Sequence, residues 1–281
     1  MSGAGQLPAT GGRHSVPAPR VTYIGHATLL FEIAGRRILT DPNFDPKLAR
    51  FLPRVAPPGI PIAELPALDA ILLTHAHADH LSFASLDALP RDVPLFAPPA
   101  VARWLARRGY VHAAPLAPDE SVDVGGVRID AAAARHIGAR YAVDRWRSAA
   151  NMYLLEGPGA SFFFAGDTAL SGDAERVVRT RLGAEQRRLD VALLPIGHAP
   201  WWKRAAFRRG HLTPADALQL FEQLGARFFI PYHWGTFRHL TSTAHAAIEE
   251  LRQRVHTLDR REDVKILEPG GTFELMAAEA M

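Results

Sequence analysis

Short apolar runs separated by turn residues dominate the chain after residue 20. Residues 21–24, 28–33 and 36–40 form three such runs, divided by a Gly-His pair and by Ala34-Gly35. Runs of this length that end in glycine-containing turns are typical of β-strands joined as a meander. The pattern therefore predicts three consecutive paired strands at the start of the folded region.

Further along the chain, strand-like and helix-like patterns are mixed. Strands are predicted at residues 69–73, 127–133, 151–156, 161–165, 191–195 and 228–231, and helices at 99–108, 213–224 and 242–255. In the second helix, Thr213 is the expected N-cap, Pro214 the first helical residue, Asp216 the third, and Gly225 follows the end. Because strands and helices do not alternate strictly, we expect a layered α/β domain and not a barrel.

Two segments differ from this pattern. Residues 1–20 are rich in Gly, Pro and Ala, so we expect a flexible tail followed by one domain over 21–281. Because these residues lack the apolar core of a signal peptide, we expect a cytoplasmic protein. Residues 42–66 contain seven prolines and are predicted to form an irregular loop. No stretch reaches the roughly 18 consecutive apolar residues of a membrane span.

Composition narrows the chemistry. The chain has 281 residues, 48% of them hydrophobic and 22% charged, which is ordinary for a globular protein. The formal net charge of +3 is too small to predict nucleic-acid binding. The absence of cysteine excludes disulfides, iron–sulfur clusters and thiolate ligands, so any metal must be held by histidine and carboxylate.

The segment LLTHAHADHL is the most informative part of the sequence. It places His75, His77, Asp79 and His80 within six positions, directly after a predicted buried strand. Burying such groups without partners costs roughly 1–3 kcal/mol each, whereas one cation satisfies several of them. Alternate residues of an extended segment face the same side, so His75, His77 and Asp79 can converge. We therefore predict a metal site here.

Four later strands also end in residues that can bind a metal. IDAAAARH ends at His136, SFFFAGDT reaches Asp167, ALLPIGH ends at His198, and RFFIPYH ends at His233. A single histidine in such a place is usually structural, but several in one chain beside the HxHxDH motif favour a shared site. Ligands gather at the carboxyl ends of strands in open α/β sheets.

These motifs carry a resemblance to a known family. THAHADH, followed in order by ARH, AGDT and PYHWGTF, resembles the metallo-β-lactamase superfamily of metallohydrolases. YIGHATLLFEIAGRRILTDPNF, LLPIGHAPWW, RRGHLTPADAL and PYHWGTF are similar to the branch that contains N-acyl-phosphatidylethanolamine-hydrolysing phospholipase D. The resemblance extends over about residues 21–275 and implies a four-layer αβ/βα sandwich with a two-metal centre at one edge.

The resemblance also implies ligands and a reaction. His75, His77 and His136 would hold one divalent ion; Asp79, His80 and His233 the other; and Asp167 would bridge them. Zinc is the expected metal, with iron and manganese as alternatives. Asp79, Asp167 and His211 are then the expected catalytic residues. The expected reaction is attack of a metal-activated water on a phospholipid-like or other phosphodiester. A lactonase, a nuclease and a non-catalytic scaffold are the competing hypotheses.

Other residues take supporting roles in the resemblance. Asp41 and His26 match positions close to the metal ligands, although a turn-forming Asp41 and a structural His26 are open alternatives. His211 is the candidate for contact with the substrate, and a residue that only leads into the helix is its alternative. His198 is assigned to the substrate side with lower weight.

The run APWWKRAAFRRGH combines aromatic and basic residues. Trp201 and Trp202 beside lysine and arginine suit a substrate-binding or interfacial surface for a small or lipid-like anionic molecule, including peripheral contact with a membrane. Stacking on RNA bases is a second reading. The third is an amphipathic loop or short helix that merely covers the sheet.

Overall fold

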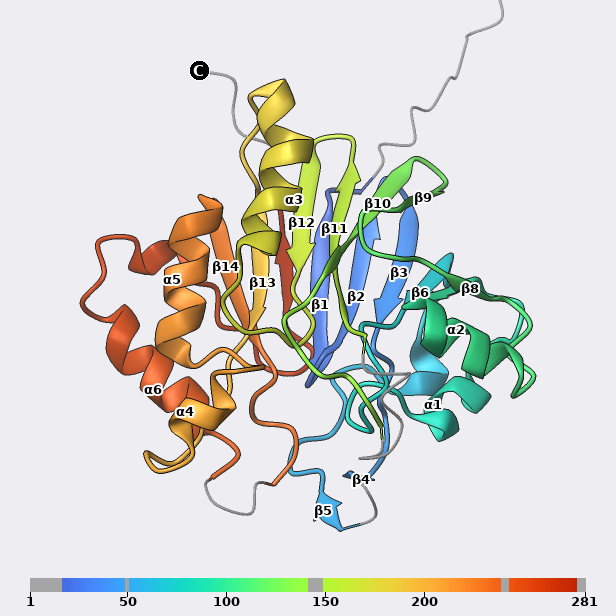
Figure 1. Cartoon of the computed structure of the whole chain (residues 1–281), viewed down its shortest axis with the longest axis horizontal. Coiled ribbons are helices and arrows are strands. Elements are labelled where there is room, and N and C mark those ends of the chain that lie inside the picture. The colour runs from blue at the N-terminus through green and yellow to red at the C-terminus, as the bar shows by residue number, and fades with distance from the viewer. Residues whose placement is uncertain (1–16, 49–50, 141–148, 239–242, 277–281) are drawn as a thin grey trace, which may run out of the picture.

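The computed structural model describes residues 17–48, 51–140, 149–238 and 243–276. Two β-sheets lie face to face, with α1 (Phe83–Ala88) and α2 (Pro99–Ala106) on one side and α3 (Gly172–Leu182), α5 (Pro214–Leu224) and α6 (Ala246–Val255) on the other (Figure 1). The predicted layered α/β sandwich is confirmed.

The first sheet has the strand order β15-β1-β2-β3-β6-β7-β8. Its centre is the predicted meander of β1 (Arg20–Gly25), β2 (Thr28–Ile33) and β3 (Arg36–Thr40), whose neighbours are antiparallel. The strands β6 (Ala70–Leu72), β7 (Leu95–Ala97) and β8 (Ala113–Pro115) extend it in parallel, and β15 (Thr272–Glu274) pairs antiparallel with β1.

The second sheet has the order β14-β13-β12-β11-β10-β9. The strands β9 (Ser121–Val124), β10 (Val127–Ala133), β11 (Asn151–Gly157) and β12 (Ala160–Phe164) are antiparallel neighbours. They are followed in parallel by β13 (Val191–Pro195) and β14 (Phe228–Tyr232). Predicted strands in this half agree with the structure to within one residue at each end.

The core follows from the alternation of side chains along the strands. In β2, Leu29, Phe31 and Ile33 point into the cluster between the sheets, whereas Leu30 points into the cluster beneath α1 and α2. β6 alternates in the same way, with Leu72 on the inner side and Ile71 on the outer. Strands buried on both faces read as continuous apolar runs, which is why these segments lack polar alternation.

The predicted helices agree with the structure to different degrees. α5 begins and ends as predicted, and Thr213 and Asp216 form a capping box. α2 ends at Ala106, two residues earlier than expected, and α6 begins at Ala246, whereas position 242 lies outside the described residues. The sequence patterns did not predict α1, α3 or the strands β7, β8, β9 and β15. The short α4 (Arg204–Phe207) lies in the aromatic and basic run, for which a short helix was one of the alternatives.

The prediction of a wholly irregular loop over residues 42–66 is wrong in detail. The described part of this segment contains the small hairpin β4 (Lys47–Leu48) and β5 (Leu52–Pro53), and a 3₁₀ turn at Ile62–Glu64. The expected tail is described only from residue 17, and β1 already begins at Arg20. Among the described helices, none is long and apolar enough to cross a membrane.

Candidate metal centre

Two groups of histidine and aspartate lie at the edge where several strands end. The first consists of His75, His77, His136 and Asp167, and the second of His26, Asp79, His80 and His233. Within each group the candidate ligand atoms all lie within 4.8 Å of one another. Every metal ligand predicted from the sequence is therefore found in one of these groups, although residues more than 150 positions apart contribute.

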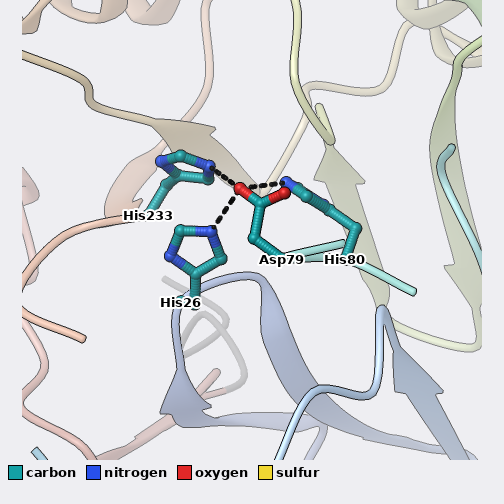
Figure 2. A group of neighbouring side chains, drawn as sticks. All are labelled: His26, Asp79, His80 and His233. Atoms are coloured by element: carbon teal, nitrogen blue, oxygen red, sulfur yellow. Dashed lines mark hydrogen bonds and ion pairs between the residues drawn. The ribbon is translucent and has the colours of Figure 1, made fainter. Parts of the chain in front are cut away.

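The second group converges on one carboxylate (Figure 2). The Oδ2 atom of Asp79 lies 3.0 Å from Nε2 of His26, 3.6 Å from Nε2 of His233 and 3.8 Å from Nε2 of His80. His26 was expected outside the ligands, but the structure places its ring inside the group, with its centroid 3.9 Å from that of His233. Since a carboxylate only accepts, Nε2 of His26 donates to Asp79.

Asp167 lies between the two groups. Its Oδ2 atom is 4.0 Å from Nε2 of His136 in the first group and 3.5 Å from Nε2 of His80 in the second. Its Oδ1 atom is 3.4 Å from Nε2 of His233. A carboxylate that faces both sets of imidazoles has the position required of a bridge between two cations.

Four inward-facing atoms of these groups lack hydrogen-bond partners among the described residues. Nε2 of His75, His80 and His233 and Oδ1 of Asp167 are all buried and unsatisfied. An unpaired buried polar atom costs about 1–3 kcal/mol, so four in one place would be a heavy penalty for a purely structural cluster. Their lone pairs converge as metal ligands do, and the residues present therefore fit divalent cations.

Outer partners orient two of these rings. The buried carboxylate of Asp41 accepts hydrogen bonds from the backbone N and Oγ1 of Thr74, each at 2.7 Å, and from Nδ1 of His80 at 2.8 Å. Because Thr74 Oγ1 donates to Asp41, it accepts from Nδ1 of His75, 2.9 Å away. Both histidines thus carry their proton on Nδ1 and turn Nε2 inward, as orienting outer partners do in metal sites.

His136 is oriented by the backbone. Its Nδ1 donates to the carbonyl oxygen of Gly210 at 2.7 Å, and its Nε2 lies 3.1 Å from Nδ1 of His77. Gly210 comes from the segment that follows α4, so this distant part of the chain sets the tautomer of a candidate ligand.

Burial and neighbouring charges lower the pKa of some histidines in the site and raise that of another. Burial holds the pKa of His75 well below its usual range, lowers that of His136 to about 4, and, with the nearby His233, lowers that of His26 to about 3. Burial acts in the same direction on His80, but the carboxylates of Asp167, Asp79 and Asp41 outweigh it and raise the pKa of His80 well above normal.

The pKa values of Asp79 and Asp167 are lowered. Burial opposes ionisation of Asp79 and Asp167, but the surrounding imidazoles, His80 and His233 among them, hold both pKa values well below the usual range. His233 has a raised pKa for the same reason: Asp167 and Asp79 together outweigh its burial. The metal-free site therefore favours ionised carboxylates beside protonated His80 and His233, and a cation that binds there must take the place of those protons.

The backbone around the site is strained. His26, Asp41 and His233 have φ angles of 56°, 37° and 70°, in the left-handed region that non-glycine residues rarely adopt. Such conformations cost energy and persist where the surrounding structure imposes them, most often at functional sites. Gly138 is also required, because a Cβ there would lie 2.5 Å from Cβ of His75.

His211 lies at the outer side of this centre. Its Nε2 is 3.6 Å from Oδ2 of Asp167, and its Nδ1 donates to the carbonyl oxygen of Phe207 at 3.3 Å. The ring stacks on that of Phe207, with centroids 4.6 Å apart. Phe207 reaches this position because Gly197 has no side chain: a Cβ there would lie 2.3 Å from the Phe207 ring.

The other predicted substrate residues lie away from the two groups. Nδ1 of His198 faces Oε2 of Glu250 on α6 at 3.7 Å. Trp201 and Trp202 are 87% and 57% exposed, and Nζ of Lys203 lies 4.7 Å from the centroid of the Trp202 ring. These two tryptophans do not cover the sheet, so that reading of the aromatic run is wrong for them.

Sequence reasoning missed several residues that position the centre. Besides Thr74 and Gly210, Asn43 donates from Nδ2 to the carbonyl oxygens of Ala78 and Asp79, at 2.9 and 3.1 Å, and fastens the ligand loop. The only signal for Thr74 was its place directly before His75. A backbone carbonyl such as that of Gly210 has no signal in sequence.

Comparisons with known proteins agree with this geometry. The family model described as the beta-lactamase superfamily domain matches residues 36–234. A metal-dependent hydrolase from Opitutus terrae is 30% identical, with 91% of this chain and all of that protein covered. N-acyl-phosphatidylethanolamine-hydrolyzing phospholipase D 1 of Caenorhabditis elegans is 26% identical, over 90% of this chain and 73% of the relative.

Two further comparisons complete the picture. A Mycobacterium tuberculosis protein is 30% identical over 78% of this chain, and the match spans only 59% of the length of that relative. The crystal structure of isothiocyanate hydrolase from Delia radicum gut bacteria has the same fold, with a TM-score of 0.73, 22% identity, and 91% and 99% of the two chains covered. The resemblance inferred from the motifs is confirmed: the chain belongs to the β-lactamase superfamily.

Proposed function

We propose that this protein is a metal-dependent hydrolase that cleaves a phosphodiester, with two divalent cations, zinc foremost and iron or manganese as alternatives, held by the two histidine–aspartate groups. The observation that carries the proposal is the set of buried, unpaired inward atoms on His75, His80, His233 and Asp167. When bound, two such cations lower the pKa of a water and offset the negative charge that develops on the substrate.

The proposed division of ligands follows the two groups. His75, His77 and His136 would hold one cation, Asp79, His80 and His233 would hold the other, and Asp167, which faces both groups, would serve both. His26 orients Asp79 through its Nε2 hydrogen bond, and Asp41 orients His80. Two divalent cations would outweigh the two facing carboxylates, Asp79 and Asp167, and would therefore favour an anionic diester.

His211 is proposed to act on the leaving group. With Nδ1 engaged by the carbonyl of Phe207, its Nε2 faces Asp167 and the open side of the centre. From there it can hold a proton for the leaving oxygen, as a general acid must. Stacking on Phe207 limits the rotation of the ring and keeps Nε2 in this direction.

A phospholipid-like diester is the proposed substrate class. The similarity to a phospholipase D from Caenorhabditis elegans supports it. So do the exposed Trp201 and Trp202 beside Lys203, because tryptophan and basic residues favour the headgroup level of a lipid surface. We propose that these tryptophans contact the apolar part of the substrate or the membrane that contains it.

Substrate screening tests the proposal. The metal-loaded protein should hydrolyse bis(p-nitrophenyl) phosphate and an N-acyl-phosphatidylethanolamine in detergent. His211→Asn should lower kcat for the lipid, whose leaving alkoxide needs a proton, by roughly 10²- to 10⁴-fold, the usual range for a general acid. Arg261→Gln, which changes an exposed side chain elsewhere, serves as the control. Turnover of lactones with none of either diester would contradict the proposal.

A further inference from the structure

A cavity lined by arginines adjoins the metal centre. It has a volume of about 190 Å³ and lies between α4 and the first turn of α5. Its lining consists of Arg135, Leu170, Ala205, Arg208, Arg209 and Asp216. This volume suits a single phosphate-sized group, and nothing in the reaction proposed above uses it.

The arginines of this cavity are not equally neutralised. Arg208 makes a two-point ion pair with the carboxylate of Asp216, with its Nε 2.9 Å from Oδ2. Arg135 donates from Nη1 to the carbonyl oxygen of Leu170 at 3.3 Å, a neutral partner. Arg209 has no ion pair with any residue that the structure describes. Among the described residues, no carboxylate therefore pairs with the positive charges of Arg135 and Arg209.

Two arginines that line the cavity are sequence neighbours of residues in the metal centre. Arg135 directly precedes His136, and Arg209 directly precedes Gly210, whose carbonyl accepts the hydrogen bond from His136. Arg135 is also held by its backbone, which donates to Oγ1 of Thr168 and accepts from the amide of Ala169, both next to Asp167. A group bound between the two arginines thus lies beside the backbone that positions His136.

We infer that this cavity is a binding site for a second anionic group of the phosphate-monoester type, held by the guanidinium groups of Arg135 and Arg209. Guanidinium matches the oxygen geometry of phosphate and stays charged at every physiological pH. The anion could be part of the substrate or a separate small molecule. The first case rests on the proposed phosphodiesterase function, whereas the second does not.

Binding of inorganic phosphate tests the site itself. Calorimetric titration of the metal-loaded full chain, at constant ionic strength, should show that Arg135→Gln/Arg209→Gln weakens phosphate binding by about tenfold or more, as expected for lost charged hydrogen bonds. Arg261→Gln, which removes one exposed positive charge, should bind phosphate like the wild type. Since phosphate also contacts the metals, only the difference between variants counts. Equal affinity in the wild type and the double variant would overturn the inference.

The exposed Arg209 provides a second variant that does not disturb the packing. Arg209→Gln alone should weaken phosphate binding in the same direction, and an unchanged affinity would count against the site even if the double variant failed to fold. Folding of each variant is checked by its melting temperature before titration.

Kinetics identify the source of the anion. The substrates are bis(p-nitrophenyl) phosphate and a nitrophenyl diester that also carries a phosphate monoester. If the double variant lowers the kcat/KM preference for the second substrate about tenfold, the pocket takes the substrate's own anion. An unchanged preference together with lost phosphate binding supports a separate anion. No turnover of either substrate by the wild type would contradict the proposed function and leave the titration as the test of the pocket.

Discussion

Asp41 shows how much of the centre depends on residues that cannot themselves reach a cation. Its carboxylate is fully buried and accepts from Thr74 twice and from His80 once. Asp41→Asn would place an amide N–H against at least one of these donors. We expect metal affinity to fall roughly 10- to 100-fold, the usual effect of losing an outer partner of a ligand.

The matched control for this change is Asp69→Asn. Asp69 also accepts from a backbone amide and a side chain, those of Arg37 and Arg36, but its side chain is partly exposed and far from the centre in the sheet. Competition with a chromophoric chelator measures both variants. Wild-type metal affinity in Asp41→Asn would show that Asp41 only forms the turn before Pro42.

The raised pKa values of His80 and His233 indicate how metal affinity should depend on pH. Nearby carboxylates raise both pKa values, so in the metal-free protein these rings hold protons at pH values where an exposed histidine has begun to lose them. A cation must displace these protons from Nε2, and its affinity should therefore rise as pH rises towards the raised values. Zinc titrations in buffers of different ionisation enthalpy should reveal proton release; identical heats in all buffers would contradict this.

The capping box of α5 is connected to the metal centre through Asp216. Asp216 closes the capping box with Thr213 and pairs with Arg208, so it links the start of α5 to the segment that holds Gly210 and His211. Burial opposes ionisation of Asp216, but the bonds from Arg208 and Thr213 outweigh it and hold its pKa below the usual value.

Asp216→Ala should therefore lower the free energy of unfolding by about 1–2 kcal/mol at neutral pH, as for a lost helix cap. Because the folded-state pKa is depressed, this contribution is present above the ordinary pKa of aspartate and is lost as pH falls through the lower folded value. Urea unfolding at pH 7 and at acidic pH measures both effects. Asp173→Ala, in the first turn of α3 where no side-chain cap bond exists, is the control and should cost less.

Elements with strong local signals could be predicted from sequence, and elements that depend on tertiary contacts could not. α5 has a capping residue, a proline at its first position, an apolar stripe and a terminal glycine, and its bounds were correct. α3 has arginines and acidic residues over most of its length and only a thin apolar face, so its local pattern did not stand out. The three-residue β7 and β15 owe their existence to pairing with neighbours, which a local pattern does not contain.

The centre shows the same division. Its ligands were predicted because the HxHxDH motif and three later strand ends, at His136, Asp167 and His233, carry residue types that packing alone does not require. The position of His26 inside the second group was not foreseen, since it depends on how β1 and β14 end beside each other, with the amide of His233 donating to the carbonyl of His26. Likewise, the contact between Gly210 and His136 joins segments 74 residues apart.

Across the whole molecule, the two sheets meet through their apolar faces and bring both halves of the ligand set to one edge. The first sheet supplies His26, Asp41 and the HxHxDH loop, and the second supplies His136, Asp167 and His233. Bound cations would therefore crosslink the two sheets, and a ligand that binds only the folded state stabilises it.

The metal content of the purified protein shows whether the two histidine–aspartate groups hold cations. Elemental analysis of the purified wild-type protein and of Asp167→Asn, which replaces the proposed bridge with a side chain of equal size, decides whether the two groups hold cations. We expect about two transition-metal ions per wild-type chain and a clear loss from the variant. Fewer than about one ion per wild-type chain after incubation with zinc, or a variant that keeps its full metal content, would contradict it.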